Sequence, residues 1–279
     1  MKNILVPTDF SDCAGYALEF AYCMSSIYDS DIVLFHNIHD KKGIWKSKKN
    51  DDDPGQKKEE IEKILNVEFE RLLTKTPIRR DKIKTAYDNG DLVENINKAI
   101  DQYNIDFVVM GSHGASGKRE FFIGSNTQKV VRAIHHPVFI VKNSVKDYKI
   151  DRVVFASDFK LTELKSLKYA LKFLEPFKPV IHLVEINTPS FFNLPEYVEK
   201  EVLEDFKALC SGFECHTHYI KDNSVDAGVR NITTKLEADM IIVSNQNRHP
   251  IKQMLRGSSV EFIINHAEVP VLSIDSEDR

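Results

Sequence analysis

Apolar residues recur along this chain in two alternating patterns: short unbroken runs, and longer stretches with the three-to-four-residue spacing of amphipathic helices. The unbroken runs are predicted to be strands and cover 4–6, 32–36, 82–87, 107–110 and 138–141. The helical spacing predicts one helix that begins at Ser11 and others over 59–74, 92–103 and 127–134. Strands separated by helices imply parallel βαβ units in a doubly wound α/β sheet.

The same order of elements occurs twice. Segment 106–110 resembles 239–243, and with that shift of 133 residues Gly124-Ser125 falls on Gly257-Ser258. The segments 4–10 and 153–159 also match, at a shift of 149. We therefore predict two tandem modules, 1–145 and 146–279, each with a five-stranded, mainly parallel sheet flanked by helices.

Composition narrows the class of protein. The chain has 279 residues, of which 42% are hydrophobic and 29% charged, which is typical of a globular protein with a core. No apolar run approaches the roughly 18–20 residues that cross a bilayer, and no secretory leader is visible. Four cysteines do not make a disulfide framework, so we expect reduced thiols, a cytoplasmic location and no membrane partner.

Charge argues against nucleic acid as a partner. The net charge is −4, and it resides in the second module, because the first 145 residues are balanced. Neither module has the excess of positive charge that binding to a phosphate backbone normally requires.

Two segments of the first module are candidates for a ligand site, because each follows a predicted strand. Pro7-Thr8-Asp9 follows the first strand, and Gly111-Ser-His-Gly114 follows the fourth. Ligands of open α/β sheets bind beyond the carboxyl ends of the strands, where the strand order reverses. Gly124 and Ser125 begin the next helix, whose free N–H groups favour a phosphate. These glycines and Ser125 together are typical of a phosphate cradle, and Asp9 could accept hydrogen bonds from a ribose.

The spacing Gly111-x2-Gly114-x9-Gly124-Ser125, together with Pro7-Thr8-Asp9, resembles the universal stress protein family. Gly90-Asp91 and His135-His136-Pro137-Val138 also resemble it, and the resemblance covers essentially the whole chain as two modules. It implies an adenine-nucleotide-alpha-hydrolase-like fold and a stress-response role as a nucleotide-binding sensor or regulator.

In the ATP-binding branch of that family, the glycine motif surrounds the phosphates and ribose, and residues after the first two strands hold adenine and ribose. The resemblance implies ATP as ligand, with AMP or ADP as alternatives and with or without Mg²⁺. Carried over by motif, the binding residues are Pro7, Thr8, Asp9, Asn37, Met110, Gly111, His113, Gly114, Gly124, Ser125 and Asn126.

The second module departs from the motif. Ser244 stands where the first module has Gly111, and Asn247 stands at the position of Gly114. A Cβ at both positions should crowd the place of the phosphate. We expect one nucleotide site, in the first module, and a second module that is structural or binds a different small ligand.

Two other sites are suggested by short motifs. Gly111-x5-Gly117-Lys118-Arg119 is one residue too long for a P-loop, and Arg119 lacks the hydroxyl that holds magnesium. Cys210, Cys215, His216 and His218 suggest zinc, but their spacing is not a common finger pattern. On a strand, His216 and His218 would share one face, which permits ligation without requiring it.

No nucleophile with its base, and no carboxylate cluster, indicates an enzyme. Three hypotheses stay open: an ATP-binding regulator, a weak ATPase that uses Asp9 and His113, and an interaction scaffold that binds no nucleotide. The family usually dimerises through the last strand of each module. Here 138–141 and 271–274 could pair within one chain as a pseudo-dimer, and further homodimerisation is left open.

Overall fold

The computed structural model describes residues 3–38, 54–76, 78–113, 123–145, 148–160, 163–188, 196–245 and 259–275. The first module contains β1 (Asn3–Pro7), α1 (Asp12–Tyr28), β2 (Asp31–Ile38), α2 (Pro54–Lys75), the 3₁₀ turn η1 (Arg80–Lys82), β3 (Ile83–Asn89), α3 (Leu92–Tyr103), β4 (Phe107–Gly111), α4 (Ser125–Ala133) and β5 (Val138–Val141). The second contains β6 (Arg152–Ala156), α5 (Leu164–Leu174), β7 (Val180–Asn187), α6 (Glu196–Leu209), β8 (Cys215–Lys221), α7 (Val225–Leu236), β9 (Met240–Asn245), α9 (Ser259–His266) and β10 (Val271–Asp275).

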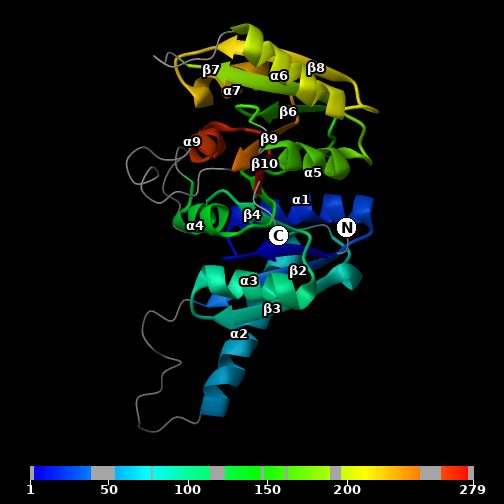
Figure 1. Ribbon diagram of the computed structural model, residues 1–279. Coiled ribbons are helices and arrows are strands. Elements are labelled where there is room, and N and C mark those ends of the chain that lie inside the picture. The colour runs from blue at the N-terminus through cyan, green and yellow to red at the C-terminus, as the bar shows by residue number, and fades with distance from the viewer. Residues whose placement is uncertain are drawn as a thin grey trace.

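All these strands form one ten-stranded sheet in the order β3-β2-β1-β4-β5-β10-β9-β6-β7-β8. Within each module the neighbouring strands are parallel, which confirms the predicted doubly wound α/β fold. The order reverses next to β1 in the first module and next to β6 in the second. The two modules therefore stack end to end along a continuous sheet, with β3 near one end and β8 near the other (Figure 1).

The modules join through β5 and β10, which pair antiparallel with Phe139 opposite Leu272. This pairing confirms the expected pseudo-dimer of modules within one chain. It leaves neither of these two strands as an open sheet edge, which would be a site of unwanted association.

Helices cover both faces of the sheet, and each face has its own core. Leu18, Phe69, Phe173 and Phe206 bring α1, α2, α5 and α6 into one buried cluster. Ile96, Val130, Val229 and Ile263 bring α3, α4, α7 and α9 into the other. The strands between them are buried on both sides, which explains their unbroken apolar runs. None of the helices in the described ranges is long and apolar enough to span a membrane.

Aromatic rings fill the junction between the modules on the first face. Phe173 of α5 lies 4.9 Å from Phe139 of β5 and 6.0 Å from Phe107 of β4, measured between ring centroids. Tyr28 of α1 packs on the same ring at 5.4 Å and donates its hydroxyl to the carbonyl oxygen of Phe173. Both modules thus share one aromatic cluster, so we expect them to behave as a single unit.

Candidate functional site

The candidate site lies at the carboxyl ends of β1 and β4, where the strand order of the first module reverses. The parallel pairing of Ile4 with Phe107 and of Leu5 with Val108 brings the ends of these strands together. Pro7, at the end of β1, therefore lies beside the last residues of β4. This edge of the sheet is where doubly wound folds bind their ligands.

The loop after β1 is held in one conformation by its own backbone contacts. The Thr8 amide donates to the Phe35 carbonyl oxygen at 2.8 Å, and His36 Nδ1 lies 2.8 Å from the Thr8 carbonyl oxygen. The Thr8 hydroxyl accepts the Phe10 amide at 3.0 Å. Phe10 has a φ of 63°, a conformation that bulky residues rarely adopt. This strained turn lies directly after Asp9, between β1 and the start of α1.

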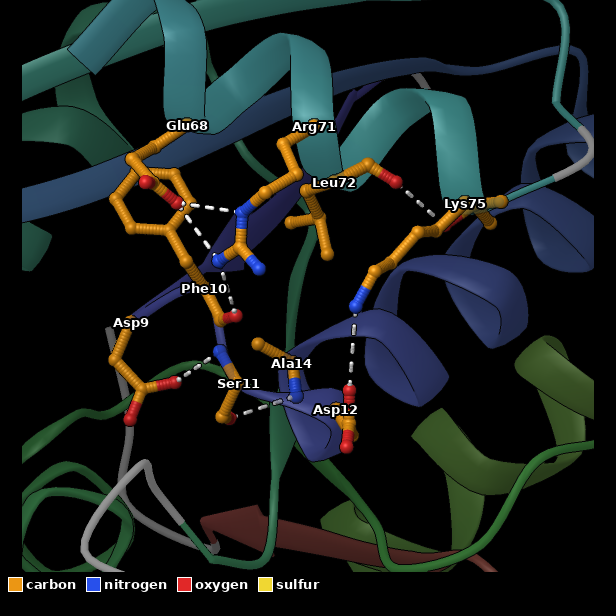
Figure 2. A network of polar contacts seen from close by, with 10 residues as sticks. Asp9, Phe10, Ser11, Asp12, Ala14, Glu68, Arg71, Leu72 and Lys75 are labelled. Atoms are coloured by element: carbon orange, nitrogen blue, oxygen red, sulfur yellow. Dashed lines mark hydrogen bonds and ion pairs between the residues drawn. The ribbon is translucent and has the colours of Figure 1, made fainter. Parts of the chain in front are cut away.

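Asp9 and Ser11 link this loop to the start of α1. Asp9 Oδ1 accepts the Ser11 amide at 3.1 Å, and the Ser11 hydroxyl caps α1 by accepting the Ala14 amide at 3.2 Å (Figure 2). Asp9 itself is exposed, so its carboxylate is accessible to a ligand.

Helix α2 packs over the loop and holds it from the other side. The Phe10 ring stacks on His36 with centroids 4.7 Å apart and meets the edge of Phe69 at 5.2 Å. Figure 2 shows Arg71 reaching from α2 to the Phe10 carbonyl oxygen at 3.5 Å while it pairs with Glu68 at 2.7 Å. The loop is therefore preorganised by a helix that comes much later in the chain.

The start of α4 is anchored to the end of β4. The Gly124 amide donates to the Ser112 carbonyl oxygen at 2.7 Å, and the Thr127 hydroxyl donates to the Gly111 carbonyl oxygen at 2.8 Å. Gly124 is the N-cap residue and provides no side-chain cap, and Ser125 is exposed. The first-turn N–H groups at Ser125 and Asn126 thus lie at the positive end of the helix dipole without a side-chain cap from Gly124.

Asn37 and Met110, two of the predicted binding residues, are buried and contact other residues of the first module. Asn37 is 8% exposed, donates to the Gly90 carbonyl oxygen at 3.2 Å and accepts from Asn95 Nδ2 at 2.8 Å. Met110 is buried in the core under α3 and α4.

His113, another predicted binding residue, is half-buried, and its Nδ1 lies 2.7 Å from the Ser112 hydroxyl. The predicted residue Gly114 lies outside the described residues.

The corresponding turn of the second module keeps the geometry but changes the charges. The Ser157 hydroxyl accepts the Phe159 amide at 2.8 Å, and Phe159 has a φ of 49°, as in the first module. Asp158 forms an ion pair with Lys160. Glu163 is buried close to Asp158, and burial with this neighbouring carboxylate raises the pKa of Glu163 to about 9. At the matching position the first module has Ala14.

The end of β9 is also filled in the second module. Ser244 stands where the first module has Gly111, and its hydroxyl lies 3.0 Å from the Ser166 hydroxyl of α5. Asn245 is buried and donates to the carbonyl oxygen of Val131 in the first module at 2.9 Å. The matching residues Asn247, Gly257 and Ser258 lie outside the described residues.

The structure does not bring the four zinc candidates together. Cys215, His216 and His218 lie on β8, where side chains alternate between faces, so Cys215 points away from both histidines. Cys210 and Cys215 contact each other on the α6 side, while His218 Nε2 lies 2.9 Å from His182 Nδ1 of β7. Among the described residues, no group of three or more histidine, cysteine or acidic side chains could hold a metal ion.

Sequence reasoning missed several residues that shape these regions. Ser112 holds Gly124, 12 residues later, and Thr127 holds Gly111, 16 residues earlier, so both fix the start of α4. In the second module, His182 of β7 contacts His218 of β8. Thr127 carried one usable signal, since threonine in the first turn of a helix often bonds to nearby backbone. The others act through partners that no local pattern reveals.

A model of the universal stress protein family matches residues 1–142 and 149–274. The chain belongs to the universal stress protein family. A universal stress protein of Methanocaldococcus jannaschii is 26% identical over 153 residues, which cover 50% of this chain and 94% of that protein. The family match, found twice, confirms the tandem organisation predicted from the internal repeat.

Solved structures of the same fold extend over both modules. A universal stress protein from Archaeoglobus fulgidus has a TM-score of 0.71 and 23% identity and covers 99% of this chain and 98% of that one. One from Pseudomonas aeruginosa has a TM-score of 0.65 and 16% identity, covering 99% and 93%. At these identities the likeness shows the two-module fold alone.

Proposed function

We propose that the first module, residues 1–145, binds an adenine nucleotide, ATP in particular, and that the chain acts as a nucleotide-dependent regulator in a stress response. The second module, residues 146–279, carries a degenerate motif and does not share this site. In this assignment the phosphates lie at the start of α4, and the loop after β1 holds adenine and ribose.

The observation that carries the proposal is the uncapped start of α4 beside the end of β4. Gly124 leaves the first-turn N–H groups without a side-chain cap, and its bond to Ser112 holds the start of α4 beside the end of β4. Such N–H groups bind phosphate oxygens directly, and the helix dipole adds to the attraction. Asp9, exposed on the neighbouring loop, would accept a hydrogen bond from a ribose hydroxyl.

The second module supports the same assignment by contrast. At the matching edge Asp158 and the buried Glu163 place two acidic groups near each other, and Ser244 adds a side chain where Gly111 has none. The ion pair with Lys160 makes Asp158 less available to a ribose hydroxyl than Asp9, and the Ser244 side chain contacts α5 at the end of β9.

The first test asks whether the protein retains a bound nucleotide through a gentle purification. Mass spectrometry of small molecules released from the full chain should find an adenine nucleotide at up to one per chain. Calorimetric titration of the stripped protein with ATP, ADP and AMP, with and without Mg²⁺, then identifies which nucleotide binds best.

Matched substitutions in the two modules locate the site. Ser125→Ala removes a hydroxyl from the proposed phosphate site and should weaken ATP binding roughly five- to tenfold. Its counterpart Ser258→Ala should leave the affinity unchanged. Asp9→Asn should also weaken binding, while Asp158→Asn should not.

The other two hypotheses predict different results. If Asp9→Asn abolishes a measurable ATP hydrolysis while ATP still binds, the chain is a weak ATPase. If no nucleotide is released and none binds at millimolar concentration, the proposal is wrong and the scaffold hypothesis replaces it.

A further inference from the structure

A cavity of about 580 Å³ lies in the second module at the amino ends of β9 and β10. Its walls come from one side of α7, the segment between α7 and β9, the start of β9, the end of α9 and the segment 267–269, together with Lys142 and Asn143 of the first module. The strands of the second module are parallel, so this edge is opposite to the one that corresponds to the nucleotide site. Its volume is in the range of sites for small molecules.

The cavity exists because three side chains are smaller than their counterparts in the first module. Helix α7 corresponds to α3 residue by residue at the shift of 133, and so do β10 and β5. At that shift Thr233, Ala238 and Ala267 stand where the first module has Ile100, Ile105 and Ile134. All three isoleucines are buried in the core beneath α3 and α4, at 3%, 5% and 1% exposure.

Neighbouring substitutions compensate for only part of the lost volume. Ile241 and Ile263 line the cavity where the first module has the slightly smaller Val108 and Val130. Each of these isoleucines has one methylene more than its valine counterpart, whereas Ala238 and Ala267 each have three carbons fewer than their isoleucine counterparts. The Thr233 hydroxyl is buried and has no hydrogen-bond partner in the described part of the chain. A core hydroxyl without a partner destabilises a fold, so packing alone does not account for this threonine.

Two of the three acidic groups on the rim of the cavity form ion pairs with a lysine or an arginine, and the third lies beside a histidine. Glu268 pairs with Lys142 at 3.1 Å, and Glu237 pairs with Arg152 at 3.2 Å. Asp226 lies 3.7 Å from His266. The charges of Glu268 and Glu237 are therefore largely balanced by neighbouring cations.

Arg230 is the remaining cation on the rim, and the first module has Asn97 at this position. Its side chain is exposed and forms no ion pair with any residue of the described ranges. The carbonyl groups at the carboxyl end of α7 offset the positive charge of Arg230 only weakly. Those of Thr233 and Thr234 already accept hydrogen bonds from the Ala238 and Glu237 amides. Compared with the first module, the second module thus has smaller side chains at three core positions and an arginine on the rim of the cavity that they leave.

We propose that this cavity binds a small carboxylate with an aryl or branched-alkyl body. The body occupies the apolar floor of Val229, Ile241 and Ile263, and the carboxylate pairs with Arg230. A guanidinium forms two parallel hydrogen bonds to a carboxylate, which is a stronger interaction than with a neutral amide. This site is separate from the proposed nucleotide site and does not depend on it.

Two matched probes test the proposal on the full chain: 3-phenylpropionate and its neutral amide, 3-phenylpropanamide. Titration followed by amide NMR should give saturable shifts confined to α7, α9 and residues 267–269. The carboxylate should bind roughly five- to tenfold more tightly than the amide. An excess of ATP should leave both titrations unchanged.

Variants then separate filling of the cavity from loss of charge. The double variant Ala238→Ile/Ala267→Ile restores the side chains that pack in the first module and should abolish binding of both probes. Thr233→Ile alone should weaken both and serves if the double variant does not fold. Arg230→Gln should remove the preference for the carboxylate, whereas Lys235→Gln, an exposed cation on the same helix outside the cavity, should not.

Three results would overturn the proposal. The first is the absence of shifts with either probe at millimolar concentration. The second is equal affinity for the carboxylate and the amide in the unmodified chain. The third is binding that persists after Ala238→Ile/Ala267→Ile in a protein that is still folded.

Discussion

Gly111 packs directly against the backbone of Cys13. A Cβ placed on Gly111 would lie 2.7 Å from both the carbonyl carbon and the carbonyl oxygen of Cys13. The glycine therefore allows α1 to approach the end of β4, in addition to any role beside a phosphate. In the second module the matching Ser244 contacts Ser166 through its hydroxyl, so the helix there meets the strand through side chains.

We expect Gly111→Ala to destabilise the protein even when no nucleotide is present. The new methyl group has no space, and overpacking of this kind typically costs about 1–3 kcal/mol. Urea unfolding of the nucleotide-free chain measures the effect. Gly15→Ala is the control, because its Cβ would lie 3.7 Å from Leu72 Cδ1, an ordinary contact, and alanine favours a helix. Equal stability of Gly111→Ala and the unmodified chain would contradict the packing role.

Asn95 should be required for the turn that precedes α3. It is buried and donates to Asn37, whose own amide donates to the Gly90 carbonyl oxygen. Asn95→Ala leaves the Asn37 oxygen buried without this donor, which we expect to cost about 1–3 kcal/mol. Thermal unfolding compared with Asn97→Ala, an exposed position on the same helix, measures the loss. A difference below about 0.5 kcal/mol would show that the contact is dispensable.

Phe173 should couple the two modules. Its ring is fully buried against Phe107 and Phe139 of the first module. Phe173→Ala should lower the free energy of unfolding by about 3–5 kcal/mol, because the junction loses its central ring. Denaturant unfolding quantifies this, and Phe262→Ala, at a side chain that is 43% exposed, is the control. Small-angle scattering of the unmodified chain should fit one compact unit, and two separated lobes would contradict the coupling.

Glu163 should make stability depend on pH. Because its pKa is about 9 in the folded chain, against an ordinary value near 4.5, folding favours the protonated acid. Its contribution to stability is therefore fully present below about pH 4.5 and is lost as pH rises toward 9.

The variant Glu163→Gln keeps the uncharged form at every pH. Relative to the unmodified chain it should gain at least about 1.4 kcal/mol between pH 4 and pH 8, the equivalent of one pKa unit. Chemical unfolding at both pH values measures the gain, and Glu175→Gln, at an exposed position, should show none. A constant difference between pH 4 and pH 8 would mean that Glu163 is ionised in the folded protein.

Local pattern was sufficient for the elements and their order. The apolar run at 107–110 and the helical spacing at 92–103 both depend on residues close together in sequence, and both correspond to observed elements, β4 and α3. The internal repeat and the family resemblance then indicated the pairing of 138–141 with 271–274. The zinc alternative was weakened by the spacing of its residues, which is not a common finger pattern.

The sequence by itself thus determined the two modules and their sheets, because both depend on periodicity and on an internal repeat, and a short motif predicted where a nucleotide would bind. Only the tertiary structure decided which distant side chains meet: Gly111 with Cys13, Asn37 with Asn95, and His182 with His218. It also decided that the substitutions at 233, 238 and 267 open one cavity, since these residues lie on a helix and two separate loops. Such contacts depend on how whole elements pack, and packing joins residues that have no shared local pattern.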